Sequence, residues 1–253
     1  MTCIIGEKKA GSSPACHLRG SPLPARFVLA DVAGHGSVVA STAAGLRDLM
    51  RRSINTPDQS RFARSLNKHF VKEPGRFATA VLVSYFAPTD HAIICNAGHP
   101  RPLHYSISQG VWRFLDADVP DALGAERSAE IGASNLPLGV IDPTSYEQFA
   151  IRLERGDLLA LYSDAFLEAR GTDGKPWGEE GLLDVVRAVT GLAPIDPSSL
   201  RVAVMDEIAR RTNEARLDDD ATMIVLHHNA SDPPEQSLGE RIRVLGKMLG
   251  LLG

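Results

Sequence analysis

Short apolar runs separated by turn residues occur through most of this chain and predict a protein rich in β-strands. Two long runs are joined by the turn Pro88-Thr89-Asp90, which is typical of a β-hairpin. Another pair flanks the turn that begins at Glu154. The predicted strands are residues 27–30, 77–86, 91–98, 103–106, 111–114, two strands within 148–166, and 221–228, with a further short run at 3–5.

Between these groups of strands, the apolar residues recur every three to four positions, as they do on one face of an amphipathic helix. This spacing predicts helices after Ser37, after Pro57, and near residues 179–190 and 198–212. The strands are grouped, with helices between the groups, and do not alternate with helices one by one. The pattern therefore favours a layered α+β fold over a parallel doubly wound sheet.

Residues 231–253 differ from the rest of the chain. Pro233 and Pro234 interrupt regular structure, and an apolar stripe at helical spacing follows them. The stripe consists of Leu238, Ile242, Leu245, Leu249 and Leu252. We therefore predict a domain over residues 1–230 and a C-terminal amphipathic helix over 231–253. Packing of this helix on the domain itself and docking on a partner or a second copy are both open, and its basic residues leave membrane-surface binding as a weaker option.

The composition is that of an ordinary globular protein and excludes several classes. The chain has 253 residues, of which 43% are hydrophobic, and a net charge of −4, which gives no indication of nucleic-acid binding. Cys3, Cys16 and Cys95 are too few and too scattered for a disulfide framework or a zinc site, and they fit a reducing cytoplasm. The sequence shows neither an apolar run long enough to cross a bilayer nor a signal peptide, so we expect a cytoplasmic protein without a transmembrane segment.

Carboxylates stand at the ends of three predicted strands. Asp31 and Asp164 each follow an apolar run, and Asp218, Asp219 and Asp220 precede the last one. A carboxylate next to a buried strand loses solvation unless charge or hydrogen bonds compensate it. Strand ends at one edge of a sheet could gather these groups around a cation, and oxygen ligands favour Mg²⁺ or Mn²⁺. For any one of them, the alternative is a helix N-cap or a turn aspartate.

Five motifs that include these carboxylates occur in a defined order. They are LADVAGHG around Asp31, NAGHPRPL around His99, NLPLGV, GDLLALYSDAFLEARGTDG around Asp164, and DDATMIVL. Together they resemble the PPM-type (protein phosphatase 2C-like) metal-dependent serine/threonine phosphatases. The most similar branch is the bacterial one that contains stage II sporulation protein E and the sigma-regulating phosphatases. The resemblance extends from about residue 26 to residue 227.

This resemblance implies a fold, a metal centre and a reaction. The fold is a four-layer α/β/β/α sandwich with a central antiparallel β-sandwich, and the centre holds two ions, Mn²⁺ or Mg²⁺. Carried over by motif, Asp31 bridges both ions, the backbone carbonyl of Val32 binds one of them, and Asp164 and Asp219 bind the other. A water activated by the two ions hydrolyses phosphoserine or phosphothreonine. The implied substrate is a phosphorylated regulatory protein, such as an anti-sigma-factor antagonist.

Several features depart from the family pattern. His35 lies four positions after Asp31, where the family histidine lies two positions on, so we interpret it as part of the loop geometry and keep a role as general acid as the alternative. We interpret His99 in the same way, as a residue that shapes the fold and is not a ligand. Residues 1–25 lack the usual Gly-Gly-Asp-like motif and are interpreted as an incomplete first strand. Ala165 replaces the usual glycine after the metal aspartate, which is strained only if its φ is positive.

These departures keep two alternatives beside the predicted phosphoprotein phosphatase. One is a catalytically weak or inactive module that keeps the phosphatase fold and still binds the regulatory partner. The other is a metal-dependent hydrolase of small phosphoesters, which needs basic residues around a closed pocket. The candidates are Arg101, within NAGHPRPL, and Arg170, within the motif around Asp164.

Overall fold

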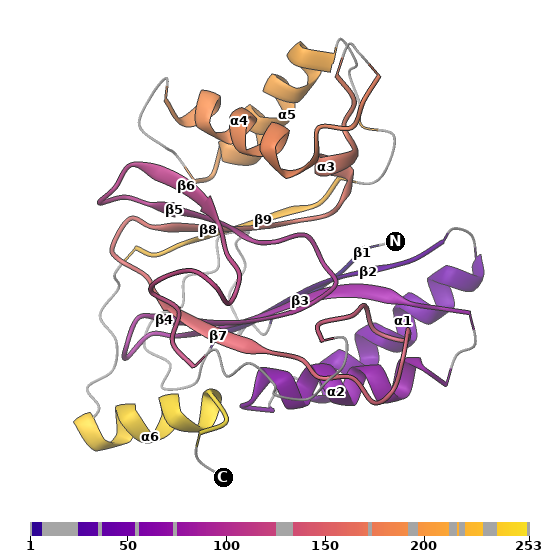
Figure 1. The fold of residues 1–253 in the computed structure, drawn as a ribbon, viewed down its shortest axis with the longest axis vertical. Helices are drawn as coiled ribbons and strands as arrows, with labels where there is room; N and C mark the ends of the chain where they lie inside the picture. Colours follow the sequence, from indigo (N-terminus) through magenta and orange to yellow (C-terminus); the bar gives the residue numbers. More distant parts are fainter. Residues whose placement is uncertain are drawn as a thin grey trace. The chain divides into compact units, whose positions relative to one another are not determined.

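The chain forms two compact units, which are described separately. The computed structural model describes residues 2–6, 25–34, 37–53, 56–72, 75–124, 134–171, 174–191, 197–212, 217, 221–229 and 237–251. Unit 1 comprises Met1–His99, Asp116–Leu153 and Ala230–Gly253, and unit 2 comprises Pro100–Leu115 and Glu154–Asn229. Figure 1 labels the helices and strands of both units.

Unit 1 contains a five-stranded sheet in which all neighbouring strands are antiparallel. Its strand order is β1-β2-β3-β4-β7. The strands are β1 (Thr2–Gly6), β2 (Ala25–Val32), β3 (Ala78–Phe86), β4 (His91–Ala97) and β7 (Gln148–Arg152). The run of residues 3–5 is therefore part of a strand, as predicted, and it pairs with the strand that carries Asp31.

Two helices of unit 1 cover one face of this sheet, α1 (Ser37–Ser53) and α2 (Gln59–Phe70) (Figure 1). Their apolar sides supply Leu46, Met50, Phe62 and Leu66 to a core that also contains Leu82 of β3. Burial of such a side chain stabilises the fold by about 1.5–3 kcal/mol. The helices are therefore held on the sheet by their apolar faces, and their polar faces are left to solvent.

The start of α2 is fixed by polar contacts as well. Asp58 is its N-cap and accepts a hydrogen bond from the backbone N–H of Arg61 at 3.1 Å. Gln59 is 1% exposed, and its side-chain Nε2 donates to Ser84 Oγ at 2.7 Å. The backbone N–H of Gln59 donates to Gln148 Oε1 at 2.8 Å. These bonds tie the first turn of α2 to β3 and β7.

The C-terminal helix α6 (Leu238–Met248) packs on unit 1, which is one of the arrangements that the sequence left open. Met248 is 1% exposed and is packed in a cluster with Phe86, Ile93 and Ala150. A capping box at Ser237 starts the helix. The N-terminal part of the apolar stripe does not join this cluster, because Leu238 and Ile242 are 74% and 61% exposed.

Unit 2 contains a four-stranded antiparallel sheet with the order β6-β5-β8-β9 and helices packed against it (Figure 1). Its elements are β5 (Leu103–Ser106), β6 (Val111–Phe114), β8 (Leu158–Tyr162), α3 (Ala165–Glu168), α4 (Gly178–Thr190), α5 (Leu200–Thr212) and β9 (Met223–His227). Leu182, Val186 and Val204 of the helices share a core with Ala160 and Tyr162 of β8. The prediction of an α+β fold with antiparallel sheets is confirmed, and the short helix α3 is an addition to it.

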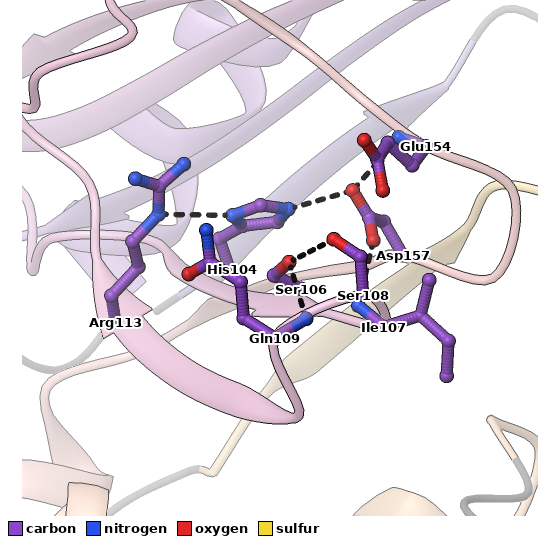
Figure 2. A network of polar contacts seen from close by, with 8 residues as sticks. All are labelled: His104, Ser106, Ile107, Ser108, Gln109, Arg113, Glu154 and Asp157. Atoms are coloured by element: carbon purple, nitrogen blue, oxygen red, sulfur yellow. Dashed lines mark hydrogen bonds and ion pairs between the residues drawn. The ribbon is translucent and has the colours of Figure 1, made fainter.

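A buried polar network joins β5, β6 and the turn before β8 (Figure 2). Asp157 is 2% exposed, and its Oδ2 accepts hydrogen bonds from His104 Nε2 at 3.1 Å and from the backbone N–H of Glu154 at 2.8 Å. Its Oδ1 accepts from the backbone N–H of Ile107 at 2.9 Å. Both carboxylate oxygens are therefore used by groups from three different parts of the unit.

The remaining nitrogen of His104 identifies its tautomer. Arg113 Nε lies 3.2 Å from His104 Nδ1, and because a guanidinium can only donate, Nδ1 is the acceptor. The ring proton of the neutral imidazole then lies on Nε2 and is donated to Asp157 (Figure 2). Burial of Asp157 alone would raise its pKa, but the hydrogen bonds from His104, Ile107 and Glu154 outweigh burial and lower the pKa.

Candidate functional site

Asp31 lies inside strand β2, one residue before its end. Ala30 and Val32 on either side of it are buried, and the Asp31 side chain is half-buried on the opposite face of the strand. The antiparallel register places Thr79 of β3 directly opposite Asp31, with Thr2 of β1 opposite it on the other side. Because α1 begins only at Ser37, Asp31 does not occupy an N-cap position, and that alternative role is wrong.

Thr79 connects Asp31 to the NAGHP motif. Thr79 Oγ1 lies 2.9 Å from Nδ1 of His99, whose side chain is 5% exposed. The Asn96 side chain holds the backbone of His99 from both sides: Oδ1 accepts from its N–H at 2.7 Å, and Nδ2 donates to its carbonyl at 2.8 Å. Directly opposed side chains in an antiparallel pair lie about 4.5–5.5 Å apart at Cβ, so His99 reaches the neighbour of Asp31 through one hydrogen bond.

The turn after Asn96 also explains the NLPLGV motif. Gly98 has a φ of 67°, and a Cβ at this position would lie 2.5 Å from the Pro137 ring. The residue after Pro137, Leu138, exchanges backbone hydrogen bonds with Ala78 at the start of β3. Both motifs therefore pack together beside the β2–β3 pair, and they shape the surroundings of Asp31 without contributing carboxylates.

Asp164 lies in unit 2, two residues after the fully buried strand β8. It is half-buried and occupies the N-cap position of α3, yet its side chain makes no capping hydrogen bond. The helix uses only the Asp164 carbonyl, which accepts from the backbone N–H groups of Leu167 and Glu168. A helix cap therefore does not account for the carboxylate. Ala165 begins α3, with helical backbone and a negative φ, so the missing glycine causes no strain there.

Asp219 and His35 lie outside the described residues, as do Asp218 and Asp220. Thr222, which follows Asp219 by three residues in the sequence, is bonded to Ser163, the residue before Asp164. Ser163 donates its backbone N–H to the carbonyl of Thr222 at 2.9 Å, and its Oγ accepts from the N–H of Thr222 at 3.0 Å.

The donors that the sequence singled out fit a hard divalent cation. They are carboxylate oxygens at Asp31 and Asp164 and the carbonyl oxygen of Val32 at the end of β2, and Mg²⁺ and Mn²⁺ favour such oxygen donors. Among the described residues, no group of three or more histidine, cysteine, aspartate or glutamate side chains is close enough to hold a metal. Asp31 belongs to unit 1 and Asp164 to unit 2, so the position of each is described only within its own unit.

The two basic residues considered for a small-molecule pocket are engaged elsewhere in unit 2. Arg101 forms a bidentate ion pair with Glu179 of α4, with Nε 3.0 Å from Oε1, and its guanidinium lies 4.9 Å from the centre of the Phe114 ring. Its carbonyl accepts a hydrogen bond from the Tyr162 hydroxyl at 2.7 Å. Arg170 donates to the carbonyl of Gly174. Arg101 thus has a structural role that the sequence did not indicate.

No helix within the described ranges is both long enough and apolar enough to cross a membrane.

Comparison with known proteins identifies a family. Residues 24–229 match the family described as Stage II sporulation protein E (SpoIIE). Stage II sporulation protein E of Bacillus subtilis (strain 168) is 31% identical over 109 residues, which cover 43% of this chain and 12% of that protein. The aligned part is therefore a small fraction of that relative.

Solved structures show a shared fold. The RsbU and RsbW domains of a Mycobacterium tuberculosis protein match with a TM-score of 0.64 and 21% identity, over 98% of this chain and 69% of that one. The PP2C phosphatase domain of SpoIIE from Bacillus subtilis, with a fragment of its regulatory domain, matches with a TM-score of 0.61 and 15% identity, over 88% and 57%. RsbX in complex with magnesium matches with a TM-score of 0.50 and 17% identity, over 88% and 92%.

Proposed function

The chain belongs to the stage II sporulation protein E (SpoIIE) family, which has the PP2C-like fold of PPM-type phosphatases, and from that membership we propose that it is a metal-dependent protein serine/threonine phosphatase. The observation that carries the proposal is the position of Asp31 and Asp164 in their units. Each is a half-buried carboxylate at the end of a buried strand, and neither is explained as a helix cap.

In this proposal the metal centre is built from oxygen donors. Asp31, the carbonyl of Val32, Asp164 and Asp219 would hold two Mg²⁺ or Mn²⁺ ions, and the magnesium in the RsbX structure supports this choice by analogy. When bound, such ions supply charge neutralisation for a phosphate and a water of lowered pKa. The described neighbours have a supporting role: Thr79 and His99 fix the surroundings of Asp31, and Ser163, directly before Asp164, is bonded to Thr222.

The proposed substrate is a phosphoserine or phosphothreonine on a regulatory protein in the cytoplasm, such as an anti-sigma-factor antagonist. Support comes from the family to which the chain belongs and from relatives such as RsbU. This support is an analogy with family members and does not rest on contacts with a substrate. The exposed Leu238 and Ile242 of α6 leave room for contact with a partner or a second copy, and that contact also stays a prediction.

The alternative is a weak or inactive module with the same fold. One of its two arguments is removed, because Ala165 has a helical backbone and imposes no strain. The other stands, because residues 1–25 contain no Gly-Gly-Asp-like motif. The hydrolase of small phosphoesters is disfavoured, since Arg101 already pairs with Glu179.

A metal titration tests the proposal directly. We expect the purified chain to hydrolyse p-nitrophenyl phosphate and a phosphoserine peptide only when Mn²⁺ or Mg²⁺ is added, and to lose both activities in EDTA, because the ions carry the chemistry. Phosphate release would be measured across a Mn²⁺ series up to millimolar concentration. Equal turnover in EDTA would refute metal dependence, and silence at every concentration would favour the inactive module.

A second prediction concerns the link from His99 to Asp31. Thr79→Val removes the hydroxyl that bonds to His99, and we expect it to lower the metal-dependent rate about tenfold, as loss of a supporting hydrogen bond near a metal ligand commonly does. Thr79→Ser keeps the hydroxyl and should retain most of the rate. The measurement is the rate together with the Mn²⁺ concentration at half-maximal activity. If Thr79 has only a structural role, Thr79→Val should lower the melting temperature. The Mn²⁺ concentration at half-maximal activity of the folded protein should then be unchanged.

A further inference from the structure

Positive charge is concentrated in the segment that forms α1 and α2. Between Ser37 and Lys72 there are seven lysines and arginines and two aspartates, a net charge of +5 in a chain whose net charge is −4. The rest of the chain therefore carries −9, the difference between −4 and +5. The seven cations, which we call the basic face, are Arg47, Arg51, Arg52, Arg61, Arg64, Lys68 and Lys72.

The packing of the two helices turns this charge outward. Both helices bury their apolar residues against the unit 1 sheet, side by side on the same face of it (Figure 1). Six cations of the basic face are exposed, and Arg64 is partly buried. No large hydrophobic side chain is exposed among the described residues of α1 and α2. The solvent side of this helix layer is therefore a basic surface on which no described large hydrophobic side chain is exposed.

The charges on this face are poorly neutralised within the described parts of the chain. Arg47 has a contact of 3.9 Å with Asp48, and Arg61 one of 3.4 Å with Asp58. The structure shows no ion pair for Arg51, Arg52, Lys68 or Lys72 with any described acidic residue.

The spacing of the cations also brings like charges together. Arg47 and Arg51 of α1 and Arg64 and Lys68 of α2 are each four residues apart within a helix, where equal charges repel. Favourable interaction with the helix dipole explains basic residues in a last turn, but not Arg61 and Arg64 in the first half of α2. An anionic partner would account for all seven.

Three kinds of anionic partner differ in what they require. A membrane-surface helix needs large apolar side chains exposed beside its cations, and the described residues of this face expose none of that kind. Nucleic-acid binding is disfavoured by the net charge of −4 and because no Phe, Tyr or Trp is exposed among the described residues of the two helices. An acidic protein surface requires only complementary charge on a rigid face, and charge steering would speed its encounter.

We propose that the basic face of α1 and α2 is a docking surface for an acidic protein partner, whose carboxylates pair with Arg51, Arg52, Lys68 and Lys72. The site lies on unit 1 together with Asp31, since β2 ends at Val32 and α1 begins at Ser37. The helix rises about 15–22 Å from Ser37 to Arg47 and Arg52, so these cations of α1 are separate from the carboxylate site. The docking surface itself is argued from charge and packing. Only the further step, that this partner is the phosphatase substrate, rests on the proposed function.

A binding experiment that needs no turnover tests the docking surface. The probe is a fluorescein-labelled peptide of ten glutamates, and its anisotropy is followed as the full chain is added at low salt without metal. In the basic-face variant, Arg51, Arg52, Lys68 and Lys72 are all replaced by glutamine. The control variant has the same charge change at four exposed cations elsewhere, Arg155, Arg201, Arg243 and Lys247.

We expect the basic-face variant to weaken peptide binding at least tenfold, and the control variant to weaken it no more than about twofold. Replacing Arg51 and Arg52 by lysine should keep the binding, which separates lost charge from lost folding. Added salt should weaken binding to the wild-type chain, because exposed charges are screened. Equal losses in both glutamine variants, or no binding of the peptide to the wild-type chain, would overturn the proposal.

Parallel titrations with a labelled DNA duplex and with phosphatidylserine vesicles decide between partner classes. Either probe, bound more tightly than the peptide and released only by the basic-face variant, would also overturn the assignment to an acidic protein. Since none of these titrations depends on phosphatase activity, an inactive chain that still binds the peptide would contradict the proposed function alone.

Discussion

Asp31→Asn and Asp164→Asn are each expected to lower metal-dependent phosphate release by a factor on the order of 10²–10³, which corresponds to about 3–4 kcal/mol of transition-state stabilisation. Asparagine has almost the size of aspartate and keeps one oxygen, so the strand ends can fold unchanged. The negative charge that would hold two divalent ions is lost. The expected result is therefore a large kinetic effect with a small change in stability.

The measurement is kcat and KM for p-nitrophenyl phosphate across a Mn²⁺ series, beside thermal unfolding of each variant. Asp206→Asn, an exposed carboxylate of α5, is the matched control and should keep the wild-type rate. If excess Mn²⁺ restores the rate of a variant, the lost carboxylate acts mainly through metal affinity. Activity that survives in both variants would exclude these residues as metal ligands.

Much of the fold could be predicted because apolar runs end at turn residues. The hairpin of β3 and β4 is an example: the turn residues at 88–90 separate two runs, and the structure turns there with a positive φ at Asp90. Helical spacing after Ser37 and Pro57 likewise gave α1 and α2. These signals are local, so one sequence is sufficient to read them.

The partners of polar residues could not be predicted, because they depend on register between distant segments. Thr79 is an unremarkable residue of a predicted strand, and only the pairing of β2 with β3 places it opposite Asp31. His104 lies in the apolar run that forms β5, and its partner Asp157 is 53 residues away. No local pattern relates such residues, and both pairs were missed.

The C-terminal helix shows the same limit for apolar residues. The stripe predicted an apolar face along the helix. Leu245 and Leu249 of the stripe are partly buried against the cluster, but the fully buried residue is Met248, which lies outside the stripe. The helix meets Phe86, Ile93 and Ala150 only near its C-terminal end, so the first residues of the stripe remain exposed.

The predicted roles of Asp219 and His35 stay predictions, because both lie outside the described residues.

The second large effect is expected in the buried network around Asp157, where Asp157→Asn should lower the free energy of unfolding by about 3 kcal/mol. Both carboxylate oxygens accept from N–H donors: Oδ2 from His104 and Glu154, and Oδ1 from Ile107 (Figure 2). Whichever way the new amide turns, its NH₂ group faces a donor. At least one buried donor then loses its acceptor, in a site where water cannot replace it.

The free energy of unfolding is measured by urea unfolding at neutral pH. In thermal unfolding, the melting temperature is expected to fall by about 6–12 °C. Asp184→Asn, whose carboxylate is 65% exposed on α4, is the control in the same unit and should change stability by less than about 0.5 kcal/mol. A loss for Asp157→Asn as small as that of the control would show that the network contributes little to folding.

The pH dependence of this difference follows from the lowered pKa of Asp157. Burial alone would raise that pKa, and the hydrogen bonds from His104, Ile107 and Glu154 lower it overall. The folded protein therefore binds the proton of Asp157 less readily than the unfolded chain, and the stabilisation is fully present above the unfolded pKa of about 3.9. It is lost as the pH falls from there through the folded pKa. Asparagine does not titrate, so the stability difference between wild type and Asp157→Asn should be constant from pH 5 to 7 and shrink below about pH 4, and a difference that grows on acidification would contradict this assignment.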